Sequence, residues 1–200
     1  MLRGNWITGA AAALAVCGLA GCGEGGRGAA GDAARDSAEV VAIGDSAALA
    51  LSGALMSRVQ EALREGGPAY AIDFCSELAM PITIAVEDSL PGEMAIKRTS
   101  TKIRNPLNSP DSLERAALDY FESELEAGRP LPPYHIQRVD GEWRYYKPIV
   151  VAQFCMHCHG PSESLEPAVR QVLAERYPTD RATGYSVGDF RGVIRVSVPD

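Results

Sequence analysis

Several signatures of enzymes and of nucleic-acid-binding proteins are missing from this chain. It has no Ser/His/Asp set, no paired-carboxylate signature and no phosphate-binding loop, so we do not predict an enzyme. The formal net charge of -7 gives no reason to expect a nucleic-acid partner. Aromatic residues make up only 6% of the chain, there are three histidines, and no internal repeat is visible. The 200 residues suffice for one globular domain.

The amino terminus has the pattern of an export signal. A short basic start precedes an apolar run from Ile7 to Ala20, which is typical of a secretory signal peptide. The run is shorter than the roughly 20 residues of a membrane-crossing helix. Its end, Leu19-Ala20-Gly21-Cys22, resembles the lipobox of bacterial lipoproteins. The alternative is an ordinary signal peptide that ends in an unrelated Cys.

The lipobox resemblance implies cleavage before Cys22 and acylation of that residue. We therefore expect residues 1–21 to be a lipoprotein signal peptide, and the protein to be lipid-anchored on the periplasmic side of a bacterial membrane. The residues that follow are mostly Gly, Ala, Asp, Glu and Arg. They offer little apolar surface to bury, so residues 22–44 are predicted to be a flexible tether and residues 45–200 the folded domain.

Apolar residues at helical spacing predict four helical segments. Leu51, Leu55, Val59 and Leu63 form one face of a helix that Gly66-Gly67 should end. Residues 71–86 should be helical with a kink or break at Pro81. Ser109 or Asp111 should cap a third helix through residue 126, and a fourth is expected around 165–176. In the third helix, we expect the inward residues to be Leu113, Ala117, Leu118, Phe121 and Leu125.

Strand patterns lie mainly in the second half of the chain. Asp140-Gly141 is a favoured two-residue turn between strand-like segments 134–139 and 142–146. Pro148 should interrupt the continuation of the second segment. Residues 94–100 and 192–198 also alternate like strands. We predict an α+β fold, with one antiparallel sheet covered by helices.

Residues 155–159 read Cys-Met-His-Cys-His, the attachment motif of c-type haem. Cys155 and Cys158 lie three positions apart on a helical turn and could meet the two vinyl groups of one porphyrin. His159 would then project toward the iron as the fifth ligand. Since c-type haem is attached after export, the motif and the signal peptide support one another. We expect one covalent haem c.

Three other interpretations of the motif are weaker. A thioredoxin-like dithiol normally lies near a βαβ pattern, and few residues follow His159. A closed zinc site would need a second tight ligand pair, which this sequence lacks. A structural disulfide between Cys155 and Cys158 would close a very small loop and stabilise little.

The residues alone leave the sixth iron ligand open. Cys17 lies in the signal peptide, so after lipidation of Cys22 and haem attachment one thiol remains, Cys75. It is either a buried core residue or a sulfur ligand. The competing ligands are His135, His157, Met56, Met80 and Met94. His157 is disfavoured because it lies inside the attachment turn.

Five short sequence blocks together resemble a known protein family. In chain order they are Ala71-Ile72-Asp73-Phe74-Cys75, Ile96-Lys97-Arg98-Thr99-Ser100, residues 102–111 (Lys-Ile-Arg-Asn-Pro-Leu-Asn-Ser-Pro-Asp), Lys147-Pro148-Ile149 and Cys158-His159-Gly160. Together they resemble a family of single c-type haem domains with a PAS-like fold, long catalogued as a domain of unknown function. The resemblance spans residues 45–198. It implies a PAS-like sheet flanked by helices and an axial Cys/His pair, with Cys75 as the sixth ligand and His159 as the fifth.

The basic residues of these blocks are candidates for the haem propionates. A propionate carboxylate could pair with Arg98, Arg104 or Lys147. Alternatively, these residues could order the loop that crosses the domain. Asn105 and Asn108 are better explained as loop-ordering residues.

The expected function is electron transfer, or redox or gas sensing, by a membrane-tethered haem protein with an unknown redox or signalling partner. Relatives in the resembling family include extracytoplasmic sensor portions of signalling proteins. This chain shows no kinase, cyclase or transmembrane segment, so a sensor role would require a partner. The alternative is a haem-dependent peroxidase with an open distal site, for which His135 is the only plausible acid/base residue.

Overall fold

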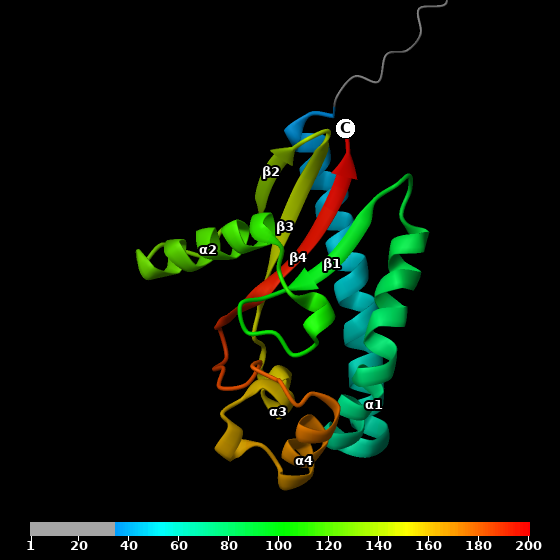
Figure 1. The fold of residues 1–200 in the computed structure, drawn as a ribbon, viewed down its shortest axis with the longest axis vertical. Coiled ribbons are helices and arrows are strands. Elements are labelled where there is room, and N and C mark those ends of the chain that lie inside the picture. Colours follow the sequence, from blue (N-terminus) through cyan, green and yellow to red (C-terminus); the bar gives the residue numbers. More distant parts are fainter. Residues whose placement is uncertain (1–34) are drawn as a thin grey trace, which may run out of the picture. The chain divides into compact units, whose positions relative to one another are not determined.

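A four-stranded antiparallel sheet lies at the centre of the computed structural model, which describes residues 35–200 (Figure 1). The strand order is β1-β4-β3-β2. Their bounds are Ala95–Thr99 for β1, His135–Val139 for β2, Glu142–Val150 for β3 and Phe190–Pro199 for β4. Helices flank the sheet, so the predicted single α+β domain with one antiparallel sheet is confirmed.

The hairpin between β2 and β3 forms at the predicted turn. Asp140 and Gly141 have φ values of 40° and 83° and join Val139 to its partner Glu142, as a type I′ turn requires. The predicted interruption at Pro148 is wrong, because β3 continues and Pro148 lies opposite Val193 of β4. Strand β2 pairs only as far as Tyr146. Beyond that point β3 has one neighbour, so the missing N–H of proline is tolerated.

Helix α1, Ser37–Ser89, is two helical halves joined at Gly67. Asp36 caps the start by accepting a hydrogen bond from the Glu39 amide, at 2.8 Å. At Gly67 φ is 74° and ψ is -171°, and Pro68 begins the second half. The chain reverses there, as Figure 1 shows. The helix end predicted at Gly66-Gly67 is therefore confirmed, whereas the backbone stays helical through Pro81 and does not break there.

One face of the sheet packs against α1. Buried residues of the first half of α1 and of three strands form this core, Val40, Leu51, Leu55, Ile96, Tyr145 and Val196 among them, and partly buried residues of the second half pack against it. Gly44 permits the close approach, since a Cβ there would lie 2.3 Å from the Tyr145 ring. Among the described residues α1 is the one helix long and apolar enough to cross a membrane by length and composition. Buried core helices meet the same criterion, and α1 packs on the sheet.

Helix α2, Ser112–Glu126, covers the other face of the sheet (Figure 1). Asp111, one of the two caps that the sequence predicted, caps it in a capping box with Glu114. Ala117, Leu118 and Phe121 are buried against Tyr146 and Val193. Leu113 and Leu125, also expected inward, are not buried, and Glu114 takes the remaining core position.

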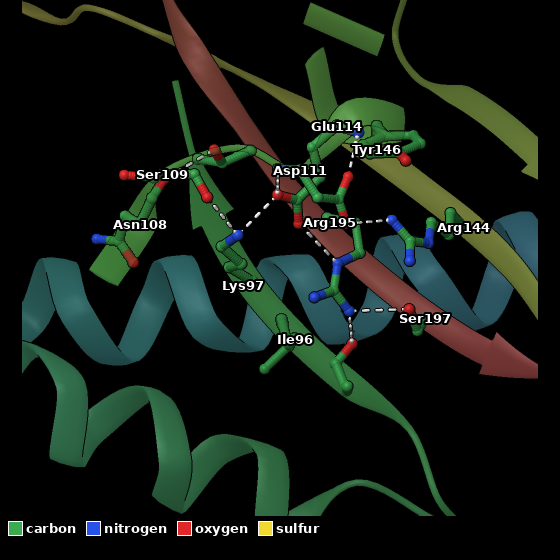
Figure 2. A network of polar contacts seen from close by, with 12 residues as sticks. Ile96, Lys97, Asn108, Ser109, Asp111, Glu114, Arg144, Tyr146, Arg195 and Ser197 are labelled. Atoms are coloured by element: carbon green, nitrogen blue, oxygen red, sulfur yellow. Dashed lines mark hydrogen bonds and ion pairs between the residues drawn. The ribbon is translucent and has the colours of Figure 1, made fainter. Parts of the chain in front are cut away.

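Glu114 is fully buried yet completely paired (Figure 2). Its carboxylate accepts from Lys97 Nζ of β1 at 2.7 Å and from Arg195 Nε of β4 at 3.2 Å. It also accepts from the amide of Asp111 at 2.9 Å. The network ties α2 to two strands, and it satisfies the charge that burial would otherwise penalise.

Short helices gather beyond the ends of the strands, low in Figure 1. The connection after β1 contains a 3-10 turn at Pro106–Asn108. Helix α3, Met156–His159, follows the 3-10 turn Gln153–Cys155. Another 3-10 turn, Ser162–Ser164, leads to α4, Pro167–Arg176, in the predicted region. Helix α4 packs on the second half of α1 through Val169, Leu173 and Ile72.

Candidate cofactor site

A cavity of about 310 Å³ lies between α1, the sheet and the segment that carries Cys155–His159. Its size is in the range of small-molecule and cofactor sites. The apolar lining includes Leu55, Val59, Leu63, Ile72, Ile149 and Ile194. The rest of the lining includes sulfur, imidazole and guanidinium groups together with hydroxyl and amide side chains.

Cys155, Cys158 and His159 all line this cavity. Cys155 ends a 3-10 turn, and Cys158 and His159 belong to the single helical turn of α3. Gly160 closes that turn, and a Cβ at this position would lie 2.8 Å from the Met156 carbonyl oxygen. Within residues 35–200 no group of three or more His, Cys, Asp or Glu side chains is arranged to hold a bare metal ion.

The His159 ring has a defined tautomer. Its Nδ1 lies 2.6 Å from the Ala182 carbonyl oxygen. Because a carbonyl can only accept, Nδ1 must carry the proton, and in a neutral ring Nε2 is left unprotonated. Burial, with Arg104 and Arg191 nearby, lowers the pKa of His159 to about 3. The ring is therefore a neutral imidazole, the form that binds metals.

The structure narrows the candidates for a second axial ligand. Cys75 and its five competitors from the sequence all lie among the described residues. Of these six, only Cys75 and Met56 line the cavity. His135 instead stacks on Tyr120, with ring centroids 4.3 Å apart, on the α2 face of the sheet. Met94 is buried in the core between α1 and the sheet. Burial raises the pKa of the Cys75 thiol, while Arg98 and Arg104 lower it.

Arg98 lies in the cavity wall with an unsatisfied donor. Its Nε is buried and has no hydrogen-bond partner among the described residues. Burial lowers the pKa of Arg98, and the other groups that act on it, Cys75, Tyr177 and Arg191, include no carboxylate. A buried guanidinium in this position fits an anionic group inside the cavity.

Two other predicted propionate partners have different contacts. Lys147 does not belong to the cavity lining and pairs with Asp45 of α1, which corrects the expectation for this residue. Arg104 does line the cavity, but its guanidinium donates to Asp180 at 3.0 Å and to the Cys158 carbonyl at 2.6 Å. Asn105 accepts a hydrogen bond from the Leu107 amide and orders the loop, as interpreted from the sequence.

Arg191 is a cavity residue that the sequence did not reveal. It donates to Ser100 Oγ at 2.7 Å and to the Lys102 carbonyl at 3.0 Å, and it lies 5.2 Å from the Tyr185 ring centroid. Burial lowers the pKa of Arg191. No local motif surrounds it, and it reaches the cavity because β4, to which it belongs, pairs with β1 and β3.

Comparison with known proteins places this chain in a family. The model of the Tll0287-like family matches residues 28–199, most of the chain. The chain belongs to the Tll0287-like family. In fold it is similar to the crystal structure of the cyanobacterial heme-protein Tll0287, with a TM-score of 0.60 and 24% sequence identity. That match covers 83% of this chain and 98% of the other. A search of curated proteins gives no match.

The Tll0287-like match also bears on the predicted domain boundary. It begins at residue 28, and α1 begins at Ser37 with Val40 fully buried. Residues 37–44 therefore belong to the folded domain, which corrects the end of the predicted tether. The predicted signal peptide, Cys22 and the first part of the tether lie outside the described residues.

Proposed function

We propose that this protein carries one covalent c-type haem in the cavity between α1 and the sheet, with thioether bonds to Cys155 and Cys158. One observation carries the proposal: the two motif cysteines, His159, a further thiol and an unsatisfied buried arginine line a single cavity. The family match and the haem named for the similar cyanobacterial protein support it.

His159 is the proposed fifth ligand, because its Nδ1–H is committed to Ala182 and its Nε2 is not. Cys75 is the proposed sixth ligand, and Met56 is its competitor inside the cavity. The raised pKa of Cys75 does not oppose this role, because coordination to a metal deprotonates a thiol. Arg98 and Arg191 are the proposed partners of the propionates, in place of Lys147.

The proposed role is electron transfer, or redox or gas sensing, on the periplasmic side of a bacterial membrane to which Cys22 tethers the chain. A thiolate donates charge and stabilises ferric iron, so the reduction potential should be low. An unknown protein partner would exchange electrons or receive the signal. We propose no peroxidase activity, because His135 lies on the α2 face and not in the cavity.

The test is the absorption spectrum of the ferric and ferrous protein, produced from residue 23 onward in a periplasm that attaches c-type haem. Wild type, Cys75→Ala and the matched control Met56→Leu are compared. We expect a c-type haem in all three, with a ferric thiolate signature that only Cys75→Ala loses. A wild-type ferric spectrum without the thiolate signature, whose sixth-ligand features are lost only in Met56→Leu, would assign the sixth position to Met56. No covalent haem in wild type would overturn the proposed function.

A further inference from the structure

A short segment after α4, residues 180–185, lies along His159 and holds it at several points. The Ala182 carbonyl accepts from His159 Nδ1. The Tyr185 amide donates to the His159 carbonyl at 3.0 Å, and the Gly184 amide donates to the Gly160 carbonyl at 2.9 Å. The same segment therefore fixes both the ring and the backbone of the proposed fifth ligand.

The position of Ala182 depends in turn on Asp180. Asp180 Oδ1 accepts from the Ala182 amide at 2.8 Å. Its Oδ2 accepts from Arg104 Nε at 3.2 Å and from Arg104 Nη2 at 3.0 Å. The pair is nearly enclosed, with 13% of the Arg104 side chain and 9% of the Asp180 side chain exposed. Asp180 is thus held by a fork of two bonds while it orients Ala182.

Arg104 also reaches the attachment motif itself. Its Nη2 donates to the Cys158 carbonyl oxygen at 2.6 Å and lies 3.4 Å from the Ala182 carbonyl oxygen. The Arg181 amide donates to the Ile103 carbonyl at 3.0 Å, next to Arg104 in the chain. The ion pair therefore joins three separate segments: the loop after β1, the Cys158–His159 turn and the segment that accepts the imidazole proton.

We infer that the Arg104–Asp180 pair is a positioning device for His159, which sets the strength of the Nδ1–H bond and the direction of Nε2. This inference rests on the proposed function, in which His159 binds the haem iron. A strong bond from Nδ1–H to a fixed carbonyl makes Nε2 a better electron donor and favours ferric iron. Arg104 acts here on the proximal side, rather than as a partner of a propionate.

The test variant is Asp180→Asn in the haem-loaded protein. The asparagine oxygen can still accept from the Ala182 amide, but the charged fork to Arg104 is lost. We expect the ferric–ferrous equilibrium to shift about tenfold toward ferrous, which raises the one-electron reduction potential by about 59 mV. The principal g values of the ferric electron paramagnetic resonance spectrum should change as well. Asp180→Ala, which also removes the acceptor for Ala182, should shift both readouts further.

Glu114→Gln is the matched control, since it also breaks a buried ion pair but does so on the α2 face of the sheet. It should lower the free energy of unfolding without changing the potential or the g values. If Asp180→Asn does not fold, Arg104→Lys is the second variant. It leaves the charge on Asp180 but removes the pair of hydrogen bonds from the guanidinium. It should raise the potential by a smaller amount.

The outcomes separate this inference from the proposed function. A wild type with covalent haem whose potential and g values are the same in Asp180→Asn would overturn the positioning role alone. Equal shifts in Asp180→Asn and Glu114→Gln would assign the effect to lost stability and would also overturn it. A wild type without covalent haem would overturn both proposals.

Discussion

Two charged side chains with buried polar atoms, on opposite faces of the same sheet, have opposite surroundings. Glu114, under α2, is paired with Lys97, Arg195 and the Asp111 amide (Figure 2). Arg98, on the α1 face, has an Nε without a partner in the described part of the chain and no carboxylate beside it. On the α2 face, protein groups alone satisfy the buried charge. The α1 face has the donors that a bound carboxylate, such as a haem propionate, would satisfy.

Removing the paired charge of Glu114 should have the largest effect on the free energy of unfolding. Glu114→Gln leaves Lys97 and Arg195 without their buried carboxylate, so the free energy of unfolding should fall by about 3–5 kcal/mol. Urea denaturation of the haem-loaded protein measures this change. The haem spectrum should be unaffected, because the network lies on the face away from the cavity. A change of less than about 1 kcal/mol would show that the network contributes little.

Removing the charge of Arg98 should change the free energy of unfolding, in a direction that depends on whether haem is attached. In the haem-loaded protein, Arg98→Met removes a propionate partner and should lower the free energy of unfolding by about 1–3 kcal/mol. In a chain that cannot attach haem, Cys155→Ala with Cys158→Ala, the same change removes an unpaired buried charge and should raise that free energy. The same sign in both backgrounds would contradict the assignment of Arg98 to an anionic ligand.

An exposed arginine provides the control for this comparison. Arg129 pairs with Glu124 on the surface, with 55% of the arginine side chain exposed. Arg129→Met should leave the free energy of unfolding essentially unchanged in both backgrounds, because a solvent-exposed ion pair contributes little to stability.

The smallest effect is expected at Lys147. Its hydrogen bond to Asp45 lowers the pKa of that carboxyl below the ordinary value of 3.8. The pair therefore stabilises the fold above about pH 4, and this contribution disappears as the pH falls through the lower pKa of the folded state. Since both side chains are partly exposed, Lys147→Met should cost less than about 1 kcal/mol at pH 7 and less still near pH 2. Thermal unfolding at the two pH values measures the difference, and a changed reduction potential would return Lys147 to the haem site.

Local signals account for what the sequence predicted correctly. The Asp140-Gly141 turn, the Asp111 cap and the break at Gly66-Gly67 each depend on a few adjacent residues, and each is found in the structure. The errors arise where neighbours elsewhere in the chain decide. Pro148 is tolerated because β2 has already ended, and Lys147 faces α1 because of the strand register.

The cavity shows the same division. The Cys155–His159 motif can be recognised in the sequence. Cys75 became a candidate ligand from the cysteine count, and the family resemblance favoured it over the alternatives. Arg191 and Asp180 carry no local signal, and Asp180 meets Arg104 only because the fold brings together residues 76 positions apart. The buried Glu114 was missed because a glutamate on a helix is ordinarily exposed, and only the strands supply its two cations.

The most direct test of the central proposal is the intact mass of the chain matured in a periplasm with haem-attachment machinery and measured after denaturation. Wild type should have the mass of the polypeptide plus one haem. The variant with Cys155→Ala and Cys158→Ala should have the mass of the polypeptide alone. A wild-type mass without haem would contradict the assignment of this cavity to a covalent cofactor.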